Sequence, residues 1–312
     1  MRIRSLPALA ALATVIALAP VAAGCSSAAG DKDGKDGKLN LVVAFYPIQY
    51  LAERVAGDRA SVTNLTKPGV EPHDLELTPE QTAKIVDADL LIYLKGLQPA
   101  VDNDAEHHLK DTSHAFDIAD VEAIKPLLDV RAESGVEGAN GIDPHFWLDP
   151  VRYAAVADAL GDRLGKLDPG HKTEYADRAK AVGGDLKALD TEFSKGLASC
   201  KHHDIVTSHA AFGYIAKRYG LTQVAIAGLS PEEEPTAKRL AEVAKYTKAH
   251  HIKVIFFETL VSPKLAETLA KETGAQAKVL DPIEGLEPGS KDTYLTVMRR
   301  NLTELHSALE CS

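Results

Sequence analysis

Residues 168–197 read DPGHKTEYADRAKAVGGDLKALDTEFSKGL. Asp168 and Pro169 supply an N-cap and a first helical residue, so a helix is expected to start there. Apolar residues then recur at intervals of three and four, the period of one helix face. These residues are Tyr175, Ala179, Val182, Leu186, Leu189, Phe193 and Leu197. The Gly183-Gly184 pair lowers helix propensity, but the stripe continues on both sides of it. The segment therefore predicts one helix of roughly 30 residues, about 45 Å long.

Short apolar runs alternate with helical patterns on both sides of this segment. The expected strands are 39–46, 62–65, 90–94, 115–118, 205–207, 223–226, 254–257 and 277–280. The expected helices are 47–55, one starting near 78, 210–219, 236–250, 263–273 and 294–309. Alternating strands and helices indicate mostly parallel sheets. We predict an α/β protein with two (β/α) sandwich lobes, 39–148 and 204–312, joined by residues 149–203. Their long helix would be a rigid linker.

The amino-terminal end has the pattern of an export signal. Residues 1–24 hold two arginines and then an apolar run that is too short to span a bilayer. The segment ends Ala-Ala-Gly before Cys25, which resembles a bacterial lipobox, where cleavage precedes a lipidated cysteine. An ordinary secretory signal with an incidental cysteine is the alternative. Residues 25–38 are expected to form the lipid anchor and a flexible tether, because residues 26–38 include no large apolar side chain.

Charge and cysteine content restrict the partners and the compartment. The formal net charge is −10, which argues against nucleic acid or anionic lipid as a partner. Besides Cys25 the chain has Cys200 and Cys311, and an extracytoplasmic compartment permits oxidation. We predict a disulfide between these two, worth on the order of 4 kcal/mol in the chain-entropy model. Two free buried thiols are the alternative.

Three histidines and one aspartate stand where predicted strands give way to loops. They are His73, His145, His209 and Asp281. Each lies in a separate strand-to-helix connection, where α/β sheets present ligands. Taken singly, each also has an ordinary structural role, as a loop or core histidine or as a turn aspartate. Together, three imidazoles and one carboxylate are a complete tetrahedral set for Zn²⁺. We predict a metal site in the cleft between the lobes.

The sequence around these residues resembles a known family. Gly-x-Glu-Pro-His-Asp at 69–74, Asp-Pro-His-x-Trp-Leu-Asp-Pro at 143–150 and Thr-Ser-His-x-x-Phe-x-Tyr at 207–214 look like motifs of the cluster A-I (cluster 9) metal-binding receptors of ABC transporters. The zinc-uptake type is the most similar, and the resemblance covers residues 39–309. It implies that the four residues bind Zn²⁺ as a transported ligand. It also implies a lipid-anchored, monomeric receptor outside the cytoplasm with an ABC permease as its partner.

Two details of the sequence refine this expectation. Manganese-binding members usually carry glutamate at the position of His209, so histidine here favours zinc. Many zinc receptors have a long His-rich loop before the second motif, whereas segment 131–141 is short and has no histidine. The remaining histidines that could collect zinc are expected to be surface residues: His107, His108, His114, His202, His203, His250 and His251. A second, sensing site is therefore not expected, and a metallochaperone partner could supply the metal.

Two alternatives remain at this point. One is a manganese receptor or metal-dependent adhesin of the same fold. The other is a zinc hydrolase that uses Glu258 or Glu71 as a general base on metal-bound water. The sequence has no His-Glu-x-x-His motif, and four protein ligands would leave no open coordination position for water. Our main prediction is therefore a receptor and not an enzyme.

Overall fold

The computed structural model describes residues 37–109, 112–129 and 141–312. The predicted signal peptide, Cys25, nearly all of the tether and residues 131–140 of the histidine-free segment lie outside the described residues. No helix in the described part of the chain is both long and apolar enough to cross a bilayer.

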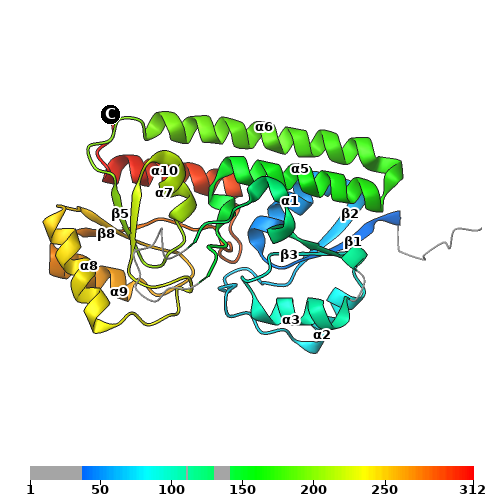
Figure 1. The fold of residues 1–312 in the computed structure, drawn as a ribbon, viewed down its shortest axis with the longest axis horizontal. Coiled ribbons are helices and arrows are strands. Elements are labelled where there is room, and N and C mark those ends of the chain that lie inside the picture. Colours follow the sequence, from blue (N-terminus) through cyan, green and yellow to red (C-terminus); the bar gives the residue numbers. More distant parts are fainter. Residues whose placement is uncertain (1–36, 110–111, 130–140) are drawn as a thin grey trace, which may run out of the picture. The chain divides into compact units, whose positions relative to one another are not determined.

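The first lobe is a parallel four-stranded sheet with helices packed against it (Figure 1). Its strands are β1 (Leu39–Val43), β2 (Ala60–Asn64), β3 (Leu90–Tyr93) and β4 (Ala115–Asp117), in the order β2-β1-β3-β4. Its helices are α1 (Tyr46–Ala56), α2 (Pro79–Val86) and α3 (Pro99–His108). The sequence missed α3, in which only Val101 and Ala105 are buried, so that its apolar stripe is too thin to recognise.

The second lobe repeats this topology. Strands β5 (Asp204–Thr207), β6 (Thr222–Ala225), β7 (Val254–Phe257) and β8 (Gln276–Val279) form a parallel sheet in the order β6-β5-β7-β8. Its helices are α7 (Gly213–Tyr219), α8 (Ala237–Ala249), α9 (Lys264–Thr273) and α10 (Tyr294–Ala308). The shared order places the carboxyl ends of β1 and β5 centrally in their sheets. The prediction of two parallel α/β lobes is confirmed, while the exact lobe boundaries at 148/149 and 203/204 remain predictions.

Two helices connect the lobes, α5 (Pro150–Leu167) and α6 (Lys172–Gly196), and they lie side by side (Figure 1). The apolar stripe of α6 from Tyr175 to Phe193 is buried, as its periodicity predicted. The helices approach so closely that a Cβ on Gly161 would lie 2.9 Å from the Cβ of Ala179. α6 also contacts α1 and α10, one from each lobe. A linker that packs along both lobes in this way favours a fixed arrangement over a hinge.

Buried hydrogen bonds tie the segment between β4 and α5 to the second lobe. The indole Nε1 of Trp147 donates to the carbonyl of Pro282 at 2.8 Å, and the hydroxyl of Tyr294 donates to the carbonyl of Trp147 at 2.5 Å. The hydroxyl of Tyr214 donates to the carbonyl of Asp143 at 2.9 Å. Trp147 and both tyrosines are buried. Residues 143–149, which include a predicted ligand, are thus held by groups of the opposite lobe.

The predicted disulfide between Cys200 and Cys311 is present. It joins the residues that follow α6 to the carboxyl-terminal end of the chain, across a sequence separation of 111 residues. A backbone hydrogen bond from Ser312 N to Ser199 O, 3.0 Å long, lies beside it. The bridge therefore fixes the end of the chain to the start of the second lobe, near the amino end of β5.

Candidate metal centre

His73 lies in the loop that follows β2. The turn before it requires Gly69, whose φ is +82° and where a Cβ would lie 2.9 Å from Pro288. The amide of Gly69 donates to the carbonyl of Leu286 at 2.8 Å, so the loop is attached to the segment after β8. The carboxylate of Glu71 accepts a hydrogen bond from the amide of His73 at 3.0 Å. The residues just before His73 thus fix the course of the loop that carries it.

His145 lies in the segment between β4 and α5, His209 lies directly after β5, and both are fully buried. His145 precedes a 3₁₀ turn, Phe146–Leu148, that leads into α5. His209 follows β5, and its carbonyl accepts hydrogen bonds from the hydroxyl of Thr207 at 2.7 Å and the amide of Gln223 at 3.1 Å. Each imidazole has its Nδ1 against a carboxylate, Asp143 for His145 and Glu258 for His209. This leaves both Nε2 atoms facing the space between the lobes.

The three predicted histidines come together around the carboxylate of Glu284. Its Oε1 lies 3.3 Å from Nε2 of His73, 2.9 Å from Nε2 of His145 and 3.3 Å from Nε2 of His209. One ligating atom from each of the four residues lies within 4.8 Å of the others, and all four are buried. Three imidazole nitrogens and one carboxylate oxygen are the donors that Zn²⁺ takes in four-coordinate protein sites. The arrangement therefore fits zinc.

Asp281, the predicted fourth ligand, is not in this group, and its place is taken by Glu284. One oxygen of Asp281 accepts from the amide of Ile283 at 2.7 Å and the other from the hydroxyl of Thr259 at 3.1 Å. Ile283 has a φ of +60°, so the chain turns sharply between the two acids. Asp281 thus acts as a turn aspartate, and the turn directs the next acid toward the histidines. The geometry therefore places Glu284, and not the predicted Asp281, beside the three histidines.

The opposite charges in the site shift each other's pKa values. Burial alone would lower the pKa of His145, but Asp143 and Glu284 outweigh it and raise that pKa. Burial is likewise outweighed at His209, where Glu258 and Glu284 raise the pKa well above its usual value. Burial would raise the pKa of Glu284, but the surrounding imidazoles hold it well below its usual range. Because metal ligands must be deprotonated, protons compete with Zn²⁺ at His145 and His209.

The two acids considered as general bases both lie beside the histidines. Oε1 of Glu258 accepts from the hydroxyl of Ser208 at 2.6 Å and lies 2.8 Å from Nδ1 of His209, on the far side of the ring from Glu284. Glu71 has one oxygen on the amide of His73, and its other oxygen is buried without a hydrogen-bond partner among the described residues. Burial and the charge of Glu284 raise the pKa of Glu71 to about 8.

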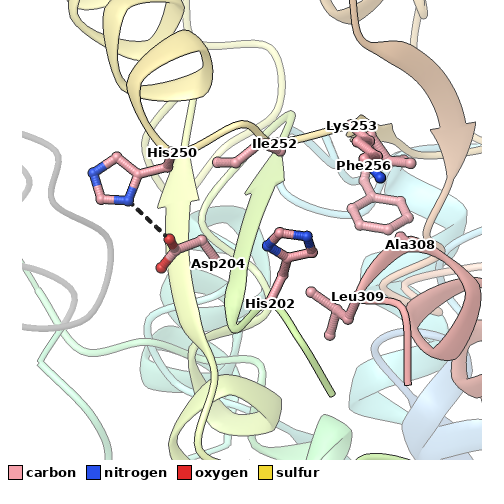
Figure 2. A pocket seen from close by; sticks show the side chains of 9 residues that line it. His202, Asp204, His250, Ile252, Lys253, Phe256, Ala308 and Leu309 are labelled. Carbon is pink, nitrogen blue, oxygen red and sulfur yellow. Dashed lines mark hydrogen bonds and ion pairs between the residues drawn. The ribbon is translucent and has the colours of Figure 1, made fainter. Parts of the chain in front are cut away.

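The remaining histidines form no comparable cluster. Among the described residues, no other group of three or more ligating side chains comes within 4.8 Å. Nδ1 of His250 lies 3.1 Å from a carboxylate oxygen of Asp204, in a small pocket that His202 also lines (Figure 2). That pocket lies at the amino end of β5, whereas His209 follows its carboxyl end.

Comparisons with known proteins agree with this geometry. The family model of the periplasmic component A of the zinc-uptake complex matches residues 41–308. The high-affinity zinc uptake system protein ZnuA of Bacillus subtilis is 35% identical over 296 residues, covering 92% of this chain and 93% of that protein. The zinc-binding lipoprotein AdcA of Streptococcus pneumoniae is 39% identical over 285 residues, covering 86% of this chain but 56% of AdcA. The chain thus spans about half the length of AdcA.

Solved structures give the same family. Zn(II)-bound AdcA of Streptococcus pneumoniae superposes with a TM-score of 0.75 at 37% identity, covering 88% of this chain and 58% of AdcA. The laminin-binding protein Lmb of Streptococcus agalactiae, described as bifunctional with adhesin and metal transporting activity, has a TM-score of 0.75 at 34% identity, covering 87% of this chain and 99% of Lmb. The fold, the histidine–glutamate cluster and the match over residues 41–308 lead to one conclusion: this chain belongs to the family of periplasmic zinc-uptake components.

Proposed function

We propose that this protein is an extracytoplasmic receptor that binds Zn²⁺ through His73, His145, His209 and Glu284 and delivers it to a membrane permease. The observation that carries the proposal is the convergence of three imidazole nitrogens and one carboxylate oxygen within 4.8 Å of one another. Components of this family work in a zinc-uptake complex with an ABC transporter permease. Zinc is the transported ligand, not a resident cofactor.

The donor set favours zinc over manganese. Imidazole suits Zn²⁺, whereas sites rich in carboxylate and water suit Mn²⁺. Three of the four donors here are nitrogens, and the single carboxylate is enough to balance one of the two metal charges. This supports the zinc receptor over a manganese receptor or adhesin of the same fold.

The surroundings of the site support binding over catalysis. A catalytic zinc keeps a position open for water or substrate, whereas four protein ligands close a tetrahedral site. Glu258 contacts Nδ1 of His209, whereas Nε2 of that ring faces Glu284, so Glu258 lies behind the ring and away from the position of a metal-bound water. We accordingly propose a transport receptor and not a hydrolase.

We further propose that Cys25 carries a lipid that anchors the receptor, as a monomer, to the outer side of the cell membrane. Replacing Cys25 by serine is expected to release the protein into the soluble fraction with unchanged zinc binding. Membrane association that survives Cys25→Ser would contradict the anchor. We also propose that a metallochaperone supplies the zinc, because the short segment 131–141 contains no histidine that could collect it.

Competition between the two metals tests the receptor function. Protein purified without added metal should take up one Zn²⁺ per chain and should retain it against an excess of Mn²⁺. His145→Ala should abolish tight binding, because His145 is buried and central to the cluster. His250→Ala is the matched control, since His250 is exposed and lies at the other end of β5. Equal loss in both variants, or preference for Mn²⁺ in the parent, would contradict the proposal.

A further inference from the structure

Two carboxylates outside the four-residue group contact the Nδ1 atoms of two of its imidazoles. Oδ1 of Asp143 lies 2.7 Å from Nδ1 of His145 and also accepts from the amide of His145 at 2.9 Å. Oε1 of Glu258 lies 2.8 Å from Nδ1 of His209. Both carboxylates are nearly inaccessible, with 1% of Asp143 and 2% of Glu258 exposed. Buried carboxylates of this kind need partners, because an unpaired buried charge is costly.

This contact decides which ring nitrogen faces the metal. A neutral imidazole has one N–H and one lone pair, and the hydrogen bond made by one nitrogen sets the role of the other. With Nδ1 donating to a carboxylate, the lone pair must be on Nε2. In both residues Nε2 is the atom that points to Glu284, at 2.9 Å for His145 and 3.3 Å for His209.

We propose that Asp143 and Glu258 are positioning residues for zinc, each fixing the orientation and the tautomer of the imidazole in front of it. The inference rests on the proposed function and adds the residues that tune it. Partners of this kind also make the ligating nitrogen more basic, and their loss typically weakens metal binding by about 10- to 100-fold. Both acids contact Nδ1 of a histidine and not the Nε2 atom that would bind the metal.

Glu258 is itself held by a second contact. The hydroxyl of Ser208 donates to the same Oε1 atom at 2.6 Å, so that this oxygen accepts from Ser208 and from His209 together. Ser208 precedes His209 directly, and Glu258 follows β7, the strand paired with β5. The pairing of the two strands thus sets the distance between the acid and the ring.

His73 differs from the other two histidines. Its Nε2 faces Glu284 at 3.3 Å, but no hydrogen bond from its Nδ1 is found in the described part of the chain. Glu71, two residues before it, accepts from the backbone amide of His73 and not from the ring. Only the two fully buried imidazoles therefore have a positioning carboxylate, and the inference applies to them alone.

The test compares zinc dissociation constants, by competition with a chromophoric chelator, in the parent, Glu258→Gln and Asp143→Asn. Each variant keeps the size of the side chain and removes its charge. We expect each to weaken zinc binding about 10- to 100-fold. Asp204→Asn is the matched control, because Asp204 forms the same kind of pair with His250, 3.1 Å apart, at the opposite end of β5 (Figure 2). It should bind zinc as the parent does.

A second measurement separates positioning from a general loss of structure. In zinc-loaded protein labelled with ¹⁵N-histidine, two slowly exchanging Nδ1–H resonances are expected, from His145 and His209. Glu258→Gln should shift or broaden only one of them, and Ser208→Ala should perturb the same one while weakening zinc binding only a few-fold. If Asp143→Asn fails to fold, Glu258→Gln and Ser208→Ala still test the inference.

The outcomes separate this inference from the proposed function. Parent-like zinc affinity in Glu258→Gln, or absence of both Nδ1–H resonances in the zinc-loaded parent, would overturn the positioning role while leaving a zinc receptor intact. Weakening of the same size in Asp204→Asn would also overturn it, because the effect would not depend on contact with a ligand histidine. A parent that binds no zinc would overturn the proposed function instead.

Discussion

Reducing the bridge between Cys200 and Cys311 should destabilise the protein strongly while leaving zinc binding nearly unchanged. The bridge closes a loop of 111 residues, which corresponds to about 4–5 kcal/mol of chain entropy at 25 °C. The native contacts around it do not depend on the sulfur atoms. Ser312 N donates to Ser199 O, and Lys201 pairs with Glu310 at 3.0 Å, so these contacts can form without the bridge. The reduced protein is therefore expected to keep its native fold with a lower free energy of unfolding.

The single tryptophan provides the assay. Trp147 is buried, and its ring lies 5.2 Å from that of His145, so that its fluorescence reports both unfolding and metal binding. Denaturant unfolding of the oxidised protein, of the protein in a non-chelating reductant and of a Cys200→Ser/Cys311→Ser double variant gives the change in free energy. The double variant should match the reduced parent and should not respond to reductant.

Zinc affinity should stay within about twofold in all three forms. The bridge precedes β5, whereas His209 follows it, so that the whole strand separates the two features. A loss of stability below about 1 kcal/mol would refute the entropic argument. A parallel large loss of zinc affinity would refute the separation of the bridge from the site.

Three further predictions concern the site. In metal-free protein the raised pKa values of His145 and His209 stabilise the fold. This stability is fully present below a pH of about 6.5, the pKa of histidine in the unfolded chain, and is lost as the pH rises through the folded pKa values. Unfolding curves at several pH values should show this loss, and zinc affinity, measured by competition, should rise over the same pH range. Glu284→Gln should weaken zinc binding at least tenfold, about 1.4 kcal/mol, whereas Asp281→Asn should change it little; the reverse order would restore Asp281 as the ligand. His209→Glu should lower the ratio of zinc to manganese affinity by exchanging a nitrogen donor for an oxygen donor, and an unchanged ratio would show that His209 does not touch the metal.

The periodic features of the sequence were sufficient to predict the two lobes and the linker. The stripe from Tyr175 to Phe193 is buried in α6 as its spacing required, and all eight strands lie within a few residues of the apolar runs. Helix α3 was not predicted because only two of its residues, Val101 and Ala105, are buried. Two apolar residues in a largely polar segment do not distinguish a helix from a loop.

The histidines were predictable and the fourth donor was not, for a physical reason. Each histidine stands in a motif that the sequence displays, although only His209 comes directly after a strand, whereas His73 and His145 lie well beyond the ends of β2 and β4. Glu284 depends on the turn made by Asp281 and on the positive φ of Ile283, a conformation that L-residues with branched side chains seldom adopt. Likewise, Glu258 and His209 are 49 positions apart in sequence, and the pairing of β5 with β7 brings them together.

Anomalous diffraction at the zinc absorption edge, from crystals of zinc-loaded protein, would show which residues bind the metal. We expect one strong peak per chain, about 2.0–2.1 Å from the Nε2 atoms of the three histidines and about 2.0–2.2 Å from an oxygen of Glu284. Asp281 should still accept its hydrogen bond from the amide of Ile283. A peak bound by Asp281 in place of Glu284, or located away from His145 and His209, would contradict the account.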